Sequence, residues 1–429
     1  MAVIQSLKSQ YQSVAFKSMG TYAVTNFFIK GISFLLLPIF TNPNYLSPSD
    51  NGLLSLFSQS ILFLMPFISL GILQSASVDY FKLDKKQFKD FCTTGFVMSS
   101  LVALIFVVIF WCFKTTLYNR FKFPLSFFWI IPAVTFFTFC IELLFLIIRN
   151  RKDPAQYMQV SVVRILLDLA LAVILIVGFS LAWKGRVTSI LVSTFFISLY
   201  GIFFLKKNNY LGGQVRMNII TKELKYSIPI IAMQLSNFCL FSSDSFLLSG
   251  ITKNNSEVGI YGMACLFASI IFTLCSAIVQ YIVPKINHLL SQQVIDYPSI
   301  RKQFNMYFFI MATGLIALLL AIPLGYKYFI NHSYLPGLKY YYFLCTGYFF
   351  WAIAYFFYTF LFYYKQKLKL LLLSLLSILI SLISNYCFIK NMGTQGAAIS
   401  VCCSYFVVLI MAVLFTKSNW KHMIKHIPA

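Results

Sequence analysis

Apolar runs of about twenty residues, each long enough to cross a hydrocarbon core roughly 30 Å thick, recur throughout this chain of 429 residues. Charged residues make up only 10% of the chain, whereas soluble domains carry about 25%. The pattern predicts an all-α integral membrane protein with about twelve transmembrane helices. We place these spans near residues 18–40, 53–78, 91–113, 126–148, 158–180, 188–205, 224–250, 258–283, 305–326, 340–363, 368–389 and 394–415.

The formal net charge of +23 would suit a nucleic-acid partner, but the positions of the charges do not. If the N-terminus is cytoplasmic, most lysines and arginines fall in the segments on the cytoplasmic side of the predicted spans. This asymmetry follows the positive-inside rule and favours contact with anionic membrane lipid. We therefore predict a multi-pass protein with both termini in the cytoplasm and no nucleic-acid partner.

Motifs of metal, redox and nucleotide chemistry are missing from the sequence. The ten cysteines lie inside predicted spans without CxxC pairs, and the four histidines show no metal-ligand spacing. No Gly-rich phosphate loop occurs, so the chain is not expected to hydrolyse ATP by itself. We predict no metal site and no cofactor.

An internal repeat divides the chain into two predicted six-helix halves, 1–210 and 211–429. The loop after the first span of each half carries a related motif, SDNG at 49–52 and SEVG at 256–259. The last spans also match, as GRVTSILVSTFF from Gly185 and GAAISVCCSYF from Gly396, which pairs Ser189 with Ser400 and Ser193 with Ser404. Because six is even, both halves enter the membrane in the same sense. A parallel pseudo-two-fold repeat of this kind is typical of transporters with a central site.

Five charged residues lie in or near predicted spans: Lys30, Glu142, Arg164, Asp168 and Asp244. A charge at the centre of a membrane helix costs about 2.5–3.5 kcal/mol, so such residues face a cavity or a partner. Arg164 and Asp168 are four residues apart and can pair along one helix. Alternatively, a bound pyrophosphate captures Arg164 and frees Asp168 to bind a proton. Glu142 can pair with Arg149.

Polar stripes accompany these charges at helical spacing. Tyr22 and Asn26 share a face with Lys30, and further polar residues line one face each of the seventh and eighth spans, namely Gln234, Asn237, Asp244, Thr273 and Gln280. We predict that these stripes line a shared cavity, which Asp244 faces. The alternative for Asp244 is a structural pair with Lys30. Tyr355 and Tyr358 can stack on sugar rings, although aromatic residues are also ordinary packing and lipid-facing material.

Four segments are similar, in order and spacing, to the motifs of one transporter family. They are LLLPIFTNPNYLSPSDNGLLSLF (35–57), RNRKDPAQY (149–157), DSFLLSGITKNNSEVGIYGMA (244–264) and SNYCFIKNMGTQGAAIS (384–400). With these segments the chain resembles polysaccharide-repeat-unit flippases of the Wzx type, in the superfamily that also holds multidrug exporters and the lipid II flippase. It departs from them at Asn51, where tyrosine is frequent, and in TNPNY, which lacks an arginine after the first span.

The resemblance implies a flippase and not an enzyme. Such a protein moves undecaprenyl-pyrophosphate-linked oligosaccharide from the cytoplasmic to the periplasmic leaflet of a bacterial inner membrane, in O-antigen, lipopolysaccharide or capsule synthesis. It works by alternating access, driven by a proton or sodium gradient. Its expected partners are the lipid-linked oligosaccharide, membrane lipid, the coupling ion and other polysaccharide-assembly membrane proteins.

Each candidate residue then has an expected role. Pyrophosphate contacts are expected from Lys30, Arg164, Asn26 and Tyr22; ion coupling from Asp244, Asp168 and Glu142; cavity lining from Gln234, Asn237, Thr273 and Gln280; and sugar contacts from Tyr355 and Tyr358. Two alternatives remain open. One is a cation-coupled drug extruder of the same superfamily, although two basic residues within spans disfavour it. The other is a membrane glycosyltransferase or polysaccharide polymerase, for which the predicted outer loops are short.

Overall fold

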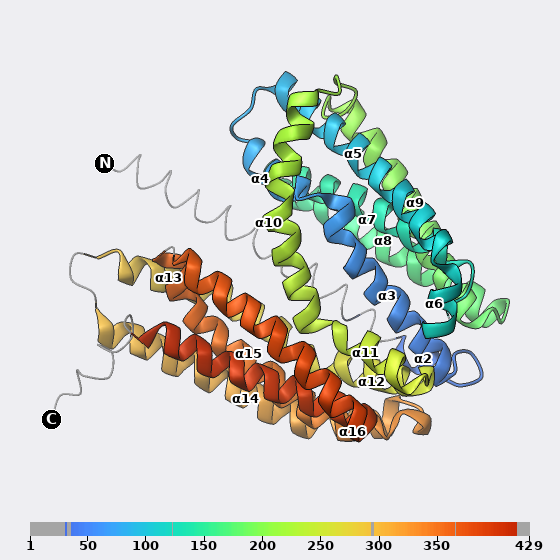
Figure 1. Ribbon diagram of the computed structural model, residues 1–429, viewed down its shortest axis with the longest axis vertical. Helices are drawn as coiled ribbons and strands as arrows, with labels where there is room; N and C mark the ends of the chain where they lie inside the picture. Colours follow the sequence, from blue (N-terminus) through green and yellow to red (C-terminus); the bar gives the residue numbers. More distant parts are fainter. Residues whose placement is uncertain (1–30, 32–35, 122, 293–295, 365, 418–429) are drawn as a thin grey trace. The chain divides into compact units, whose positions relative to one another are not determined.

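The computed structural model describes residues 31, 36–121, 123–292, 296–364 and 366–417. Over these residues every regular element is a helix, and no strand occurs (Figure 1). The chain divides into two compact units, Met1–Leu235 and Ser236–Ala429. The all-α fold expected from the apolar runs is therefore confirmed.

The first unit is built around one strongly apolar and largely buried helix, as expected for a helix with neighbours on most sides. This central helix is α7, which packs against α3, α5, α8 and α9. The elements of the unit are α2 (Leu37–Phe40), α3 (Pro48–Ser69), α4 (Ile72–Asp79), α5 (Lys85–Cys112), α6 (Lys114–Phe121), α7 (Phe127–Asn150), α8 (Pro154–Val173), η1 (Ile174–Gly178), α9 (Ala182–Lys207) and most of α10 (Met217–Phe241).

A tight turn between α7 and α8 reverses the chain. Lys152 adopts a left-handed conformation with φ of 57°. The Asp153 side chain then accepts a hydrogen bond from the Gln156 amide at 3.0 Å, and Pro154 occupies the first turn of α8. An N-cap acid followed by proline is a strong helix start. The turn sends α8 back along α7, so that side chains of both helices can line one pocket.

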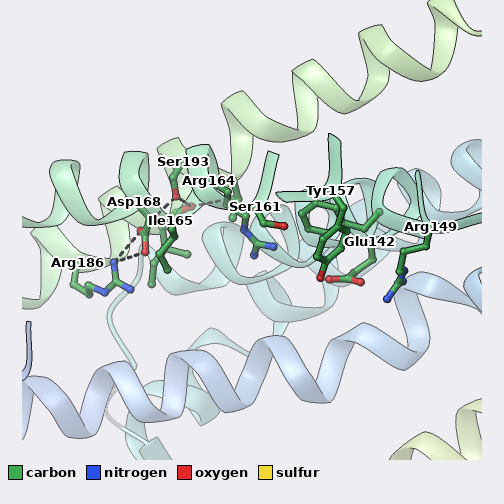
Figure 2. Close-up of a pocket in the computed structure, with 12 residues that line it drawn as sticks. Glu142, Arg149, Tyr157, Ser161, Arg164, Ile165, Asp168, Arg186 and Ser193 are labelled. Atoms are coloured by element: carbon green, nitrogen blue, oxygen red, sulfur yellow. Dashed lines mark hydrogen bonds and ion pairs between the residues drawn. The ribbon is translucent and has the colours of Figure 1, made fainter. Parts of the chain in front are cut away.

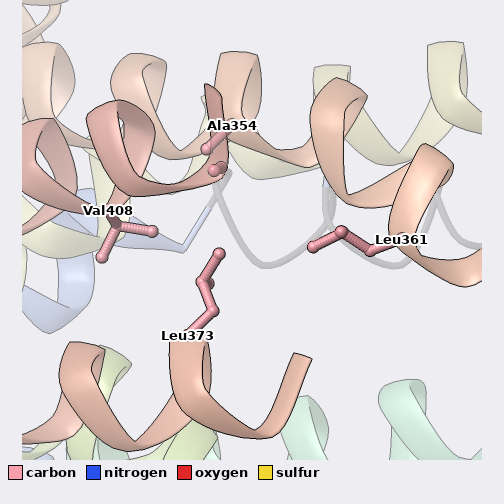
Figure 3. Close-up of a cluster of buried hydrophobic side chains, with 5 residues drawn as sticks. Ala354, Leu361, Leu373 and Val408 are labelled. Carbon is pink, nitrogen blue, oxygen red and sulfur yellow. The ribbon is translucent and has the colours of Figure 1, made fainter. Parts of the chain in front are cut away.

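The second unit has its own apolar core. Its elements are the end of α10, α11 (Ser243–Thr252), α12 (Asn255–Ala268), α13 (Ile270–Leu290), α14 (Tyr297–Phe329), η2 (His332–Tyr334), α15 (Gly337–Tyr363) and α16 (Lys367–Phe415). Figure 3 shows a cluster that joins α15 to both ends of α16, formed by the fully buried Ala354, Leu361, Leu373, Val408 and Ala412.

The α16 segment is two helices joined at a kink. Gly393 has φ of 57° and ψ of −135°, which breaks the helix and suits only glycine. Three residues later, a Cβ on Gly396 would overlap the carbonyl oxygen of Phe388. Glycine at 396 therefore allows the two backbones to approach closely. The kink lies between the last two expected spans, 368–389 and 394–415.

Most of the other expected spans correspond to helices, and some of them contain a helix break that was not expected. Nine helices among the described residues are long and apolar enough to cross a membrane, with α16 counted once. The span expected near 53–78 is interrupted at Leu70 and Gly71, which both have positive φ, and the span near 224–250 is divided between α10 and α11. The span expected at 18–40 lies mostly outside the described residues. The predicted halves, 1–210 and 211–429, stay a prediction.

The aligned serines of the repeat have matching contacts inside each unit. In the first unit, Ser189 and Ser193 of α9 donate to Asp168 at 3.3 and 3.4 Å. In the second unit, the matched Ser400 and Ser404 meet the hydroxyl of Ser384 at 3.0 and 2.7 Å. The two last spans thus use the same positions to contact the preceding helix, with an acid in one unit and a serine in the other.

Candidate functional site

A polar pocket lies inside the first unit, between α7, α8 and α9. Its volume is about 430 Å³, and Figure 2 shows the side chains that line it. The lining residues are Glu142, Phe145 and Arg149 of α7; Tyr157, Ser161, Arg164, Ile165 and Asp168 of α8; and Arg186, Ile190, Ser193 and Thr194 of α9. Each helix contributes residues three or four positions apart, which places one stripe of each helix on the pocket.

One end of the pocket is closed by an ion pair. Arg186 Nη1 donates to both carboxylate oxygens of Asp168, at 2.8 and 2.9 Å. Ser189 and Ser193 add donors to the same carboxylate. We call these four residues the closed end of the pocket. Arg186 and Asp168 thus form a charge-assisted pair in which both carboxylate oxygens accept a hydrogen bond.

The predicted pairing of Asp168 with Arg164 is therefore wrong. Asp168 pairs with Arg186, which lies near the start of α9. The sixth span was expected to begin at residue 188, but α9 begins at Ala182, so Arg186 was placed in a loop and overlooked. An arginine facing the acid from a neighbouring helix, with two serines beside it, satisfies the carboxylate better than one on its own helix.

At the other end of the pocket, Glu142, Arg149 and Arg164 form no ion pair with any residue that the structure describes. We call Glu142, Arg149, Tyr157, Ser161 and Arg164 the open end. Among the described residues, Arg164 and Glu142 form no ion pair within 4 Å, although Glu142 and then Asp168 attract the Arg164 guanidinium. Ser161 is only 4% exposed, and its hydroxyl has no hydrogen-bond partner in the part of the chain that the structure describes. Arg149 is exposed, so this end of the pocket reaches the surface of the unit.

The charges alternate in sign along the pocket. Figure 2 shows them in the order Arg186, Asp168, Arg164, Glu142 and Arg149. The first two neutralise each other, which leaves two guanidiniums and one carboxylate at the open end. A guanidinium presents a planar fork of donors that matches carboxylate and phosphate oxygens. The open end therefore suits an anion.

Glu142, Arg164 and Asp168, which the sequence singled out, all line this one pocket. Arg186 and Ser161 were not predicted. The spacing of Tyr157, Ser161, Arg164 and Asp168 on α8 was a usable signal, since it repeats at intervals of four, three and four residues.

Asp244 lies in the second unit, in the first turn of α11, and is 5% exposed. The Tyr261 hydroxyl of α12 donates to one carboxylate oxygen, and the Ser245 amide donates to the other at 2.8 Å. Tyr348 and Tyr405 lie within electrostatic reach. In the part of the chain that the structure describes, no cation pairs with Asp244. Its orientation toward a cavity shared by both halves stays a prediction.

Several predicted residues lie apart from the pocket. Lys30, Asn26 and Tyr22 fall outside the described residues, which also leaves the proposed Lys30–Asp244 pair outside them. Gln234 is half-buried on α10, Asn237 is exposed, and Thr273 is half-buried on α13. The side chain of Gln280 is not among those described.

The aromatic residues of α15 pack on one another. The Tyr355 ring is stacked on Tyr358 at 6.4 Å and lies 5.5 Å from Trp351, which in turn packs edge-on against Phe272 at 4.9 Å. Such contacts stabilise helix packing. The sugar-contact role of Tyr355 and Tyr358 stays a prediction.

Comparison with solved structures shows the same fold in membrane transporters. An inward-facing multidrug resistance MATE family transporter of the MOP superfamily is 15% identical, with 92% of this chain and 99% of that chain covered and a TM-score of 0.69. Lipid II flippase MurJ in an inward closed conformation is 14% identical, with 94% and 89% covered and a TM-score of 0.76. At these identities the likeness concerns the fold.

The sequence comparisons identify the family. No curated protein matches the chain. The profile of one family, described as polysaccharide biosynthesis protein, matches residues 15–290. This range covers more than half of the chain and includes the whole pocket between α7, α8 and α9. The expected likeness to the flippases and exporters of this superfamily is confirmed, and the chain belongs to the polysaccharide biosynthesis protein family.

Proposed function

We propose that this protein is a flippase for undecaprenyl-pyrophosphate-linked oligosaccharide repeat units. The observation that carries the proposal is the Arg164 guanidinium, which faces a pocket between membrane-spanning helices without an ion pair among the described residues. A positive charge in such a place is costly unless it serves a partner. A pyrophosphate linked to a lipid is an anion that has to cross the same apolar core.

The family and the fold support a transport role. The chain belongs to a polysaccharide biosynthesis family and shares its fold with a lipid II flippase and with MATE transporters. Transport by alternating access changes no chemical bond, so we propose no catalytic residue. Lys30, Asn26 and Tyr22 are proposed, from the sequence alone, as further contacts of the pyrophosphate.

Ion coupling is assigned to the acids that lack a cationic partner. Asp168 is held by Arg186, whereas Asp244 and Glu142 form no ion pair among the described residues. A buried carboxylate without a cation is costly in a low-dielectric interior. A proton or sodium ion would neutralise it, and this is how a gradient would drive the cycle.

The protein is proposed to reside in a bacterial inner membrane with both termini in the cytoplasm. A cation-coupled drug extruder shares the fold, but two guanidiniums and one carboxylate at the open end favour an anionic ligand over a cationic one. A membrane glycosyltransferase or polymerase would need catalytic side chains, and none of the roles that we propose for the site residues is catalytic.

The test is genetic replacement in a strain with a defined surface polysaccharide. A strain that lacks its own repeat-unit flippase should regain the surface glycan when it produces this chain. Lipid-linked repeat units should stop accumulating in the inner leaflet. If the protein inserts well and restores drug resistance but no glycan with any repeat unit supplied, the extruder alternative holds instead.

A further inference from the structure

The open end of the pocket has features of an anion site. Arg164 and Arg149 lie on either side of Glu142 (Figure 2). The buried Ser161 hydroxyl, for which the described residues provide no hydrogen-bond partner, lines the same space. A buried hydroxyl left unpaired is uncommon in proteins, because its desolvation is not offset. An oxyanion at the open end would accept its hydrogen bond.

We propose that the open end binds the phosphate or diphosphate group of an anionic ligand between Arg164 and Arg149, and that Glu142 takes up a proton from water when this group binds. The inference deepens the proposed function and rests on it for the identity of the natural ligand. It places anion binding and proton uptake in one pocket of the first unit.

Electrostatics links the two events. Two anionic groups cannot share a small low-dielectric site in their charged forms, so one of them binds a proton. The charged or titratable groups that face Glu142 in the pocket are Arg149 of its own helix, Tyr157, Arg164 and Asp168 of α8, and Arg186 of α9. The helices α3, α4 and α5 also pack against α7 but contribute no lining residue.

The closed end explains why Glu142, and not Asp168, is the acid that responds. Asp168 has one arginine and two serine hydroxyls as donors. Freeing it would leave Arg186 without its carboxylate, whereas Glu142 forms no ion pair among the described residues. The pocket thus combines a fixed pair with an exchangeable acid.

The experiment measures ligand binding by the purified full chain in neutral detergent, at pH 6 and pH 8. Inorganic pyrophosphate and farnesyl diphosphate are the probes, with farnesol as the uncharged control. Arg164→Gln should weaken binding by about tenfold or more, because it removes a charged hydrogen-bond donor. Ser161→Ala should weaken it to a smaller extent.

The matched control is Arg151→Gln. This arginine is two residues from Arg149, but its guanidinium already donates to Asn208 at 3.1 Å and lies over the Phe204 ring. The Arg151→Gln substitution should leave binding unchanged.

Glu142→Gln should strengthen binding at pH 8 and flatten its pH dependence, since uptake of one proton changes affinity by at most about tenfold per pH unit. Titration of the probe itself is common to both proteins and cancels in the comparison.

The outcomes separate the site from the transport role. The anion site is supported if the protein binds both probes, or farnesyl diphosphate alone, and if Arg164→Gln loses this binding. Binding of farnesyl diphosphate alone identifies the anionic group as a lipid headgroup. Absence of binding by either probe, or equal binding by wild type and Arg164→Gln, overturns it. A pH dependence in Glu142→Gln equal to that of wild type overturns the proton exchange. If the chain binds the probes as expected but exports no glycan, the flippase function is refuted and the anion site stands.

Discussion

Asp168 shows how a charged side chain inside a helical bundle is stabilised. Its carboxylate is held by Arg186 and by two serine hydroxyls. Removing one member leaves the other charged and poorly solvated, whereas removing both leaves neither. Substituting one residue of the pair should therefore destabilise the protein more than substituting both.

We expect Asp168→Ala to destabilise the protein by about 1.5–3 kcal/mol, the usual contribution of a hydrogen bond to a charged group. Arg186→Met in the same chain should recover part of this loss. Thermal unfolding in detergent measures both. If the double variant is less stable than either single variant, the two residues act independently and the pairing is not the source of stability.

Glu223 provides a pH dependence outside the membrane-spanning segments, since the apolar part of α10 begins at Ile230. Burial raises the pKa of its carboxyl above the ordinary 4.5, partly opposed by the hydrogen bond that Ser75 donates at 2.6 Å. Nearby Asp79 also raises this pKa, and Lys222 lowers it. The folded state therefore binds the proton more tightly than the unfolded state does.

With that sign, the stability from Glu223 is present at low pH and is lost as the pH rises from 4.5 through the raised value. Glu223→Gln keeps an acceptor for Ser75 and removes the titration. Its melting temperature should fall less than that of wild type across this range and exceed it by a few degrees at pH 8. Parallel pH profiles of the two proteins would show that Glu223 does not contribute.

At the scale of elements, Gly396 lies where the two helices of α16 approach each other closely. A Cβ on Gly396 would overlap the Phe388 carbonyl oxygen, whereas a Cβ on Gly325, inside α14, would meet no atom of the described residues within 4 Å. Gly396→Ala should therefore cost about 1–3 kcal/mol through overpacking. Gly325→Ala should be neutral or add about 0.5–1 kcal/mol, because glycine is unfavourable inside a helix. Equal melting temperatures of the two variants would contradict the close approach of the two α16 helices at Gly396.

Helix positions could be predicted because apolar length alone sets them, but helix breaks could not. The interruption at Leu70 and Gly71 depends on left-handed backbone at two residues, and Leu70 carries no sequence signal for it. Likewise α10 ends at Phe241, and α11 begins at Ser243 inside one apolar run. Tertiary packing decides such breaks.

The site was predictable in part for a related reason. Charges inside apolar runs are visible in the sequence, so Glu142, Arg164 and Asp168 were found. Their partners depend on which helices pack together, so Arg186 was missed. The unpartnered hydroxyl of Ser161 is a property of three-dimensional packing, and no spacing rule reveals it.

For the whole molecule, the distribution of lysine and arginine predicts a topology with both termini in the cytoplasm. In a cysteine-free chain, single cysteines at Ser47 or His332 should react with an impermeant reagent from outside the cell. Cysteines at Lys86 or Lys302 should react only after permeabilisation. Labelling at Lys86 in intact cells would reverse the orientation, and with it the direction of entry to the pocket.

The central claim is that Arg164 meets the anionic group of a lipid-linked glycan during export. The most direct measurement compares lipid-linked repeat units and surface glycan in cells that carry Arg164→Gln, with Arg151→Gln as the control and membrane insertion checked for both. We predict that Arg164→Gln lowers surface glycan by about tenfold or more, given the usual loss from a missing charged contact, while lipid-linked units accumulate in the inner leaflet. Near-normal export by a well-inserted Arg164→Gln protein would contradict the claim.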